Sequence, residues 1–414
     1  MRSLSEKQDR ARPGKRCPVL FSGLLLFGMG LVLGGGFVTP ASANPAGGAV
    51  RAGTIRIQDH GDLLRVIQES RMGIIDWNSF SIAGGETTRF VQPDAGSATL
   101  NRVVGESLSR IDGRLLANGR IFLLNSNGIV IGRDGVVDVA GFTASTLDLS
   151  NEAFLAGGDL TFRGDSQAAV VNLGSISAFD GDIFLVAATV ENAGSLRAPR
   201  GTVGLAAGNE VLIRESGSER IFVRGASGGE KEEGVVNKGA IEANVAELKA
   251  YGGNVYGMAV KNEGRVVATG VSREGGQIFL LAGGRRPGGA ATGGGRVRST
   301  GHLEASRPGE AEGGRVVVDA GPEGSTEIGG VVEAGSDSGE GGDIILLGNS
   351  VELFEGSLIL ADGESGGGTI RVGGGPGGKD PDLANAETVT VGRGSLLRAD
   401  ALGTGEGGSV IVFA

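Results

Sequence analysis

Residues 170–178 read Val-Val-Asn-Leu-Gly-Ser-Ile-Ser-Ala, and residues 190–198 read Val-Glu-Asn-Ala-Gly-Ser-Leu-Arg-Ala. Both match the pattern Val-x-Asn-x-Gly-x-apolar, which returns at residues 235–241 and 260–266. A repeat of 20 to 25 residues is typical of a solenoid, because one repeat cannot bury its apolar face alone and must stack on the next. The repeated asparagines, which we expect to form hydrogen-bonded ladders at a corner of the coil, are Asn172, Asn192, Asn237 and Asn262.

A second motif, Gly-Gly-x followed by apolar residues, alternates with the first. In Thr369-Ile370-Arg371-Val372 the alternation predicts a strand with Ile370 and Val372 pointing inward. Two short strands per repeat, joined by Gly-rich turns and stacked in parallel, predict an all-β fold, a right-handed parallel β-helix (a pectin-lyase-like solenoid) with N-terminal capping strands. A propeller or sandwich is less compatible with the 20-residue step and with only 1 Trp and 2 Tyr.

The spacing also predicts local features. The step of 45 between Asn192 and Asn237, and the step of 37 between Ala268 and Ala305, each fit two turns of about 20 residues. Gly61–Met72 has apolar residues at helical spacing, which predicts a short helix. Segments rich in Gly, Pro or charge are expected to form loops outside the coil: Glu215–Gly234, Gly283–Thr300 and Gly373–Glu387.

Composition excludes several classes of function. The 414 residues include 80 Gly, a density that disfavours helical folds. The net charge is −10 overall and +4 over residues 1–43, so residues 44–414 carry −14, which argues against nucleic acid as a partner. The single cysteine, Cys17, excludes a disulfide framework, a thiol nucleophile and a cysteine-zinc site from residues 44–414. We expect no cofactor and no metal.

Residues 1–43 have the features of a signal peptide. A basic segment precedes the uncharged apolar stretch Val19–Val38, and Ala41 and Ala43 occupy the −3 and −1 positions of a small-residue cleavage site. The stretch is also long enough to span a bilayer, so a permanent anchor is the alternative. Cleavage before Asn44 is the favoured interpretation.

Residues 74–132 contain an ordered series of motifs: Ile74–Ile82, Phe90–Pro93, Leu100–Val103, Ile111–Gly113, Leu116–Leu124 and Asn125–Gly132. Further motifs follow at Ser145–Asp148, Phe154–Gly157 and Gly204–Gly208. In this order they resemble the N-terminal domain of filamentous-haemagglutinin-type two-partner-secretion (TPS) exoproteins, the haemagglutination activity domain family. The resemblance covers roughly residues 44–290.

The resemblance implies a protein that is exported through the periplasm of a Gram-negative-type bacterium and secreted or held at the cell surface. Its implied partner is a dedicated outer-membrane transporter with periplasmic docking domains. It further implies action as an adhesin or haemagglutinin-like protein, with host-cell or surface glycans or proteins as possible ligands. The implied organisation is a signal peptide (1–43), a TPS β-helix domain (44–290) and Gly-rich β-helical repeats (291–414).

The family's Asn-Pro-Asn-Gly motif aligns with Asn125, Ser126, Asn127 and Gly128, followed by Ile129, so serine replaces the proline. Asn and Gly both favour tight turns, so a turn between two buried strands is expected. The motif has two possible roles: it holds the first coils together, which we favour, or its asparagines contact the transporter. The family's Asn-Pro-Asn-Leu motif is absent.

Two alternatives remain open. Parallel β-helices also include polysaccharide-active enzymes, whose sites need clustered carboxylates with basic partners. The candidate acids, Asp180 with Asp182 and Asp59 with Asp62, adjoin glycines and are interpreted as turn residues, and His60 and His302 as surface residues, so no catalytic residue is expected. The chain also stops within a repeat at Ala414, so a truncated, non-functional fragment is the other alternative.

Overall fold

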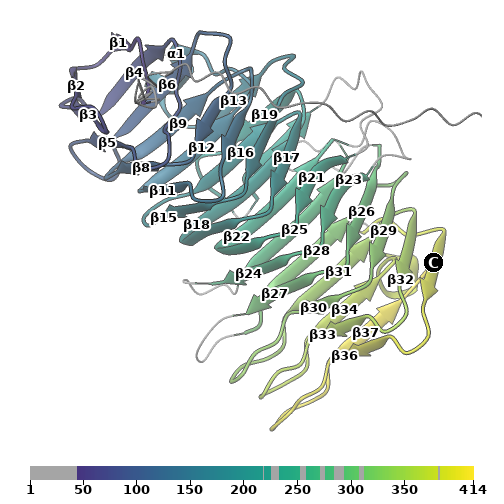
Figure 1. Ribbon diagram of the computed structural model, residues 1–414. Coiled ribbons are helices and arrows are strands. Elements are labelled where there is room, and N and C mark those ends of the chain that lie inside the picture. The colour runs from purple at the N-terminus through teal and green to yellow at the C-terminus, as the bar shows by residue number, and fades with distance from the viewer. Residues whose placement is uncertain are drawn as a thin grey trace, which may run out of the picture. The chain divides into compact units, whose positions relative to one another are not determined.

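The computed structural model describes residues 44–217, 219–224, 233–251, 258–270, 276–283, 293–306, 312–380 and 383–414. The predicted signal peptide lies outside these residues. The described chain belongs to one compact unit of stacked parallel strands (Figure 1). Among the described residues, no helix has the length and apolarity needed to span a bilayer.

Each turn of the coil contributes strands to three faces. The first face stacks β3 (Leu63–Gln68), β5 (Thr87–Val91), β8 (Arg114–Ala117), β11 (Val136–Val139), β15 (Ser175–Ala178), β18 (Ser195–Ala207), β22 (Ala240–Ala250), β24 (Arg265–Thr269), β27 (His302–Ser306), β30 (Val331–Glu333), β33 (Leu358–Leu360) and β36 (Leu396–Arg398). The second face stacks β4 (Met72–Trp77), β6 (Ala98–Val103), β9 (Arg120–Leu124), β12 (Gly141–Ser145), β16 (Ile183–Ala187), the second halves of β18 and β22, β25 (Gln277–Ala282), β28 (Arg315–Asp319), β31 (Asp343–Leu347), β34 (Thr369–Val372) and β37 (Ser409–Val412).

The third face is a ten-stranded sheet. It stacks β7 (Ser109–Ile111), β10 (Ile129–Ile131), β14 (Ala169–Asn172), β17 (Thr189–Asn192), β21 (Glu233–Asn237), β23 (Met258–Asn262), β26 (Arg296–Ser299), β29 (Ser325–Ile328), β32 (Ser350–Leu353) and β35 (Thr388–Val391). The first two faces form one 24-stranded sheet because β18 and β22 continue around the corner between them.

The interior is filled by columns of aliphatic side chains, because parallel stacking brings equivalent residues of successive turns together. In the third face Val170 pairs with Val190, Val190 with Val235, and Val235 with Val260. All four are fully buried. The inward positions predicted for Ile370 and Val372 are correct, since both are buried. The predicted parallel β-helix is confirmed.

The N-terminal end of the coil is closed by antiparallel strands. β1 (Ala49–Ala52) pairs antiparallel with β4, and β2 (Ile55–Asp59) pairs antiparallel with β3. The predicted helix over Gly61–Met72 is wrong, because this segment contains β3 and the start of β4. In β3 the buried side chains alternate, at Leu64, Val66 and Gln68, which is the period of a strand.

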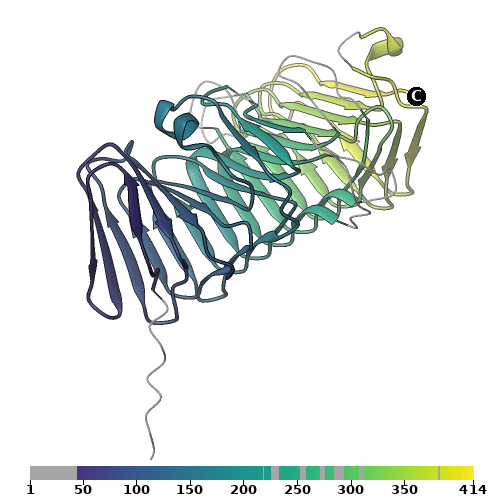
Figure 2. The same cartoon turned by 90° about the horizontal axis from the view of Figure 1, so that it is seen from above.

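The predicted two-turn steps are also wrong. Asn192 pairs directly with Asn237, and Ala268 with Ala305, so each step is a single turn with a long excursion. The 45-residue turn contains β19 (Glu210–Ile213) and β20 (Ile221–Arg224), which form an antiparallel three-stranded sheet with β13 (Leu160–Arg163). The sheet and the short helix α1 (Asn151–Ala156) lie outside the coil (Figures 1 and 2).

The three predicted loops are only partly irregular. Glu215–Gly234 contains β20 and the start of β21, and Gly283–Thr300 contains β26, which pairs within the third face. Residues 218, 225–232 and 284–292 lie outside the described part. Gly373–Glu387 contains the 3-10 helix η1 (Pro376–Gly378), and residues 381–382 of this segment lie outside the described part.

The repeated asparagines line one interior corner. The Asn172 side-chain amide donates to Asn192 Oδ1, Asn192 to Asn237 Oδ1, and Asn237 to Asn262 Oδ1, each at 2.8 Å. Asn262 donates to Ser299 Oγ at 3.1 Å, so serine continues the ladder one turn further. All four asparagines are fully buried, so their amides depend on one another for hydrogen bonds.

We expect Asn192→Ala to lower the free energy of unfolding by about 2–4 kcal/mol, because it removes the hydrogen bond that Asn172 donates to Asn192 and the one that Asn192 donates to Asn237. Asn385→Ala, at an exposed asparagine, is the control and should change stability little. Chemical denaturation of both variants measures the difference, and equal stabilities would contradict a stabilising ladder.

Candidate functional site

The Asn125–Ile129 segment lies between β9 and β10, at a corner of the early coil. The Asn125 side-chain oxygen accepts the Asn127 backbone N–H at 2.9 Å, and the Asn125 carbonyl accepts the Gly128 N–H at 3.1 Å. Gly128 has φ +111°, a conformation that strains residues with a Cβ. The segment therefore forms a tight turn built on an asparagine side chain.

The turn is tied to the preceding turn of the coil by its two amides. The Asn125 amide, which is 1% exposed as a residue, donates to Ser107 O at 3.0 Å and to Ser109 Oγ at 2.9 Å. The Asn127 side chain is exposed and donates to Gly105 O at 2.8 Å. The two asparagines thus fix the loop of residues 104–108 that leads into β7.

The other three positions differ in exposure. Ser126 is exposed, and its carbonyl accepts a hydrogen bond from Ser166 Oγ at 2.7 Å. Gly128 is buried, and its carbonyl accepts the Ser109 N–H at 3.0 Å. Ile129 is fully buried in the central core. Only Ser126 and Asn127 therefore present side chains to a partner.

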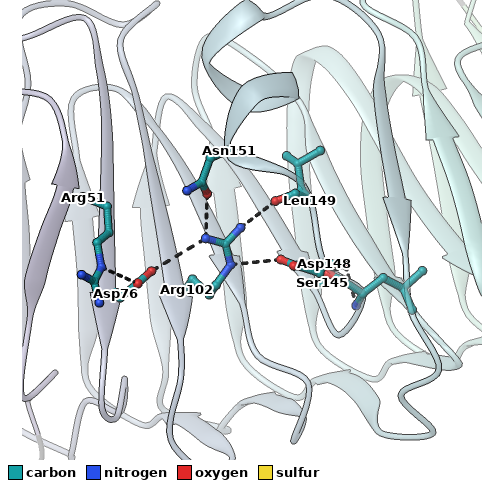
Figure 3. A network of polar contacts seen from close by, with 8 residues as sticks. Arg51, Asp76, Arg102, Ser145, Asp148, Leu149 and Asn151 are labelled. Atoms are coloured by element: carbon teal, nitrogen blue, oxygen red, sulfur yellow. Dashed lines mark hydrogen bonds and ion pairs between the residues drawn. The ribbon is translucent and has the colours of Figure 1, made fainter.

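A second polar cluster, which the sequence analysis did not identify, surrounds Arg102 on β6 (Figure 3). The Arg102 guanidinium donates to Asp148 Oδ1 at 3.0 Å, to Leu149 O at 2.6 Å and to Asn151 Oδ1 at 2.8 Å. It also lies 3.7 Å from Asp76 Oδ1, and Asp76 in turn accepts a 2.7 Å bond from Arg51. This cluster fastens the segment that leads into α1 onto the second face.

A third cluster fastens the three-stranded sheet to the coil. Glu247 on β22 is fully buried and accepts the backbone N–H groups of Arg220 and Ile221 at 2.8 and 3.0 Å. Lys249 pairs with Glu247 at 2.7 Å and with Glu219 at 2.8 Å. The buried Glu247–Lys249 pair therefore fixes the loop that leads into β20. Removing either partner would leave the other as an unpaired buried charge, which is costly.

Both clusters have a signal in the sequence. Glu247 and Lys249 alternate with the buried Ala246 and Leu248, so two opposite charges face outward on a strand that is otherwise apolar. Arg102 and Asp76 lie at paired positions of β6 and β4. Charged residues that point outward from an otherwise apolar strand of the coil therefore indicate where an inserted segment is attached.

The acids considered as catalytic candidates take part in structural contacts. Asp59 Oδ1 accepts the Gly61 N–H at 2.9 Å, and the Asp62 carbonyl accepts the Thr87 N–H at 2.8 Å. Asp182 binds the Thr202 N–H and the Arg220 guanidinium, both at 2.8 Å.

The remaining candidates, Asp180, His60 and His302, each contact different residues. The exposed Asp180 lies 3.9 Å from Arg200. The exposed His60 donates its backbone N–H to Leu63. His302 Nε2 lies 4.0 Å from Glu304 and 3.9 Å from Glu333. Within the described ranges no three His, Cys, Asp or Glu side chains are arranged to hold a metal ion.

We expect Arg102→Ala to lower the free energy of unfolding by about 2–3 kcal/mol, since it removes three charge-assisted hydrogen bonds. Amide hydrogen exchange should accelerate over residues 146–163 more than in the coil interior. The matched control is Arg110→Ala, whose exposed side chain forms an ion pair with Asp112, two residues further along the chain. Uniform acceleration throughout the chain would contradict a local anchor.

Two curated relatives match part of the chain. A heme/hemopexin-binding protein of Haemophilus influenzae (strain ATCC 51907 / DSM 11121 / KW20 / Rd) is 40% identical over 113 residues, which is 27% of this chain and 12% of that protein. A second heme/hemopexin-binding protein of Haemophilus influenzae is 39% identical over 98 residues, 23% of this chain and 11% of that protein. The chain therefore spans about an eighth of the length of these relatives.

Among solved structures, the HMW1 secretion domain from Haemophilus influenzae is similar over almost its whole length. The match covers 90% of this chain and 96% of that chain, with 27% sequence identity and a TM-score of 0.64.

The TPS secretion domain family matches residues 41–299, more than half of the chain. Its members are secreted, non-enzymatic proteins of Gram-negative bacteria, and membership implies recognition by an outer-membrane transporter of the TpsB type. The resemblance found in the sequence is confirmed. The chain belongs to the TPS secretion domain family and contains the secretion domain of a two-partner-secretion exoprotein.

Proposed function

We propose that residues 44–290 are the segment that a dedicated outer-membrane transporter recognises through its periplasmic docking domains, after the signal peptide is removed between Ala43 and Asn44. The observation that carries this proposal is the match of the secretion domain family to residues 41–299 of a chain folded as a parallel β-helix. Residues 291–414 then extend the coil as Gly-rich repeats.

At the cell surface or after release, the exported protein acts as an adhesin or haemagglutinin-like protein toward surface glycans or proteins. Two features support this role. The stacked turns keep long excursions, such as the β19–β20 hairpin, outside a continuous apolar core. Residues 44–414 are also strongly acidic, which favours solubility outside the cell.

The Asn125–Ile129 turn affects export through folding rather than through direct contact. Asn125 is almost completely buried, so a transporter has little access to its amide. Both Asn amides are already engaged with the backbone or side chains of the 104–109 segment. Loss of either amide therefore loosens the early coil.

We expect Asn125→Ala and Asn127→Ala to reduce secretion in cells that contain the cognate transporter. Both should also lower the melting temperature of the full secreted chain, Asn125→Ala more strongly, because its amide is buried and makes two hydrogen bonds. The exposed Ser126→Ala is the matched control within the same turn and should change neither quantity.

Secretion assays and thermal unfolding on the same variants separate the two roles. Lost secretion with unchanged melting temperature would refute the folding role and assign the asparagines to transporter recognition. If both secretion and stability are unchanged, the Asn125–Ile129 turn has no role in export.

A further inference from the structure

A groove lies beside α1 on the outer side of the second face, and its volume is about 820 Å³. We call it the α1 groove. Strands β4, β6, β9, β12 and β16 contribute to its lining, and so do α1, Leu160 of β13, Ile213 of β19 and the residues that follow β19. The volume falls within the range of pockets that hold small organic ligands. All of its lining residues are described.

The floor of the α1 groove is apolar. Met72, Phe122 and Leu160 are partly buried, and Phe122 packs edge-on against Phe154 with ring centroids 5.2 Å apart. Leu155 lines the groove with 45% of its surface exposed. An apolar body placed here would therefore remove both aromatic and aliphatic surface from water.

The lining of the α1 groove contains more arginines than acids, although the chain as a whole is acidic. Four arginines contribute to it, against the two acids Asp182 and Glu215. Arg220 is neutralised by Asp182 at 2.8 Å, and Arg214 lies 4.0 Å from Asp159. Arg120, in contrast, is exposed and has no ion pair or side-chain hydrogen bond to any described residue. The four arginines are Arg71, Arg120, Arg214 and Arg220.

We propose that the α1 groove binds an amphiphilic anion, that is, a carboxylate or similar group on an apolar body of fatty-acid size. The apolar body lies over Met72, Phe122 and Leu155, and Arg120 with its basic neighbours binds the anionic group. Charge complementarity selects this occupant: the Arg120 guanidinium, which forms an ion pair with no described carboxylate, lies beside an apolar floor and fits a ligand that has an anionic group and an apolar body. This site is separate from the Asn125–Ile129 turn and is independent of the proposed export role.

The probe is dodecanoate, kept below its micelle concentration and titrated into the full secreted chain by calorimetry. We expect saturable binding with one site per chain, weakening about two- to fourfold for each methylene removed in decanoate and octanoate. Dodecyltrimethylammonium, with the opposite charge, should bind at least about tenfold more weakly.

Two pairs of variants locate the site. Ala156 lies at the exposed end of α1 and lines the groove, so Ala156→Glu should weaken dodecanoate binding at least about fivefold, whereas the uncharged Ala156→Gln should not. Arg120→Gln should weaken binding about three- to tenfold, whereas Arg114→Gln, at an exposed arginine of β8 outside the groove, should leave it unchanged. Circular dichroism of each variant checks that the fold is retained.

Several outcomes would overturn the proposal: no saturable dodecanoate binding, equal binding of the cationic probe, or binding that Ala156→Glu leaves intact. A concentration-dependent dimer that Ala156→Glu dissociates would also overturn it, since a second copy would then be the occupant. Dodecanoate binding is measured on the purified chain and secretion in cells that contain the transporter, so failure of this proposal is distinguishable from failure of the export proposal.

Discussion

The fold depends on how closely successive turns approach one another at the Asn-x-Gly corner. A Cβ at Gly194 would collide with the carbonyl oxygen of Gly174, and one at Gly239 with that of Gly194. The same relation joins Gly264 to Gly239, so the glycines stack as a column in which each backbone lies directly on the last. The asparagine two residues earlier lies at a paired strand position and donates a hydrogen bond to its equivalent in the next turn.

The apolar core and the asparagine ladder are completed inside the coil, so insertions on the outer surface do not interrupt them. Excursions leave the corners and return one turn later in the same register, as Asn192 and Asn237 show across 45 residues. Outward-facing charges then attach the excursions: Arg102 holds the segment before α1, and Glu247 holds the loop into β20. The secretion domain is therefore a uniform core with specific outer elements, and the α1 groove lies where two of those elements meet the second face.

The repeat in the sequence was sufficient to predict the parallel β-helix. Val, Asn and Gly recur in a fixed order, and stacking gives Val an apolar neighbour, Asn a hydrogen-bond partner and Gly room for close backbone contact. Local periodicity was less reliable: Gly61–Met72 has apolar residues at helical spacing, yet pairing with β2 and β5 makes it a strand. Spacing also misassigned the long turns, since chain length does not distinguish an insertion from a second turn. The Arg102 and Glu247 clusters join segments 25 to 49 residues apart, and these contacts appear only once the register is known.

The most direct test of the stacking constraint compares two glycines by their free energies of unfolding. Gly239→Ala places a Cβ against the backbone of Gly194, whereas Gly84→Ala places one where no atom lies within 4 Å. We expect Gly239→Ala to lower the free energy of unfolding by at least about 2–3 kcal/mol, because the added Cβ is overpacked against backbone atoms. Gly84→Ala should change it by less than about 1 kcal/mol. Equal stabilities for the two variants would contradict the claim that close backbone stacking at this corner determines the fold.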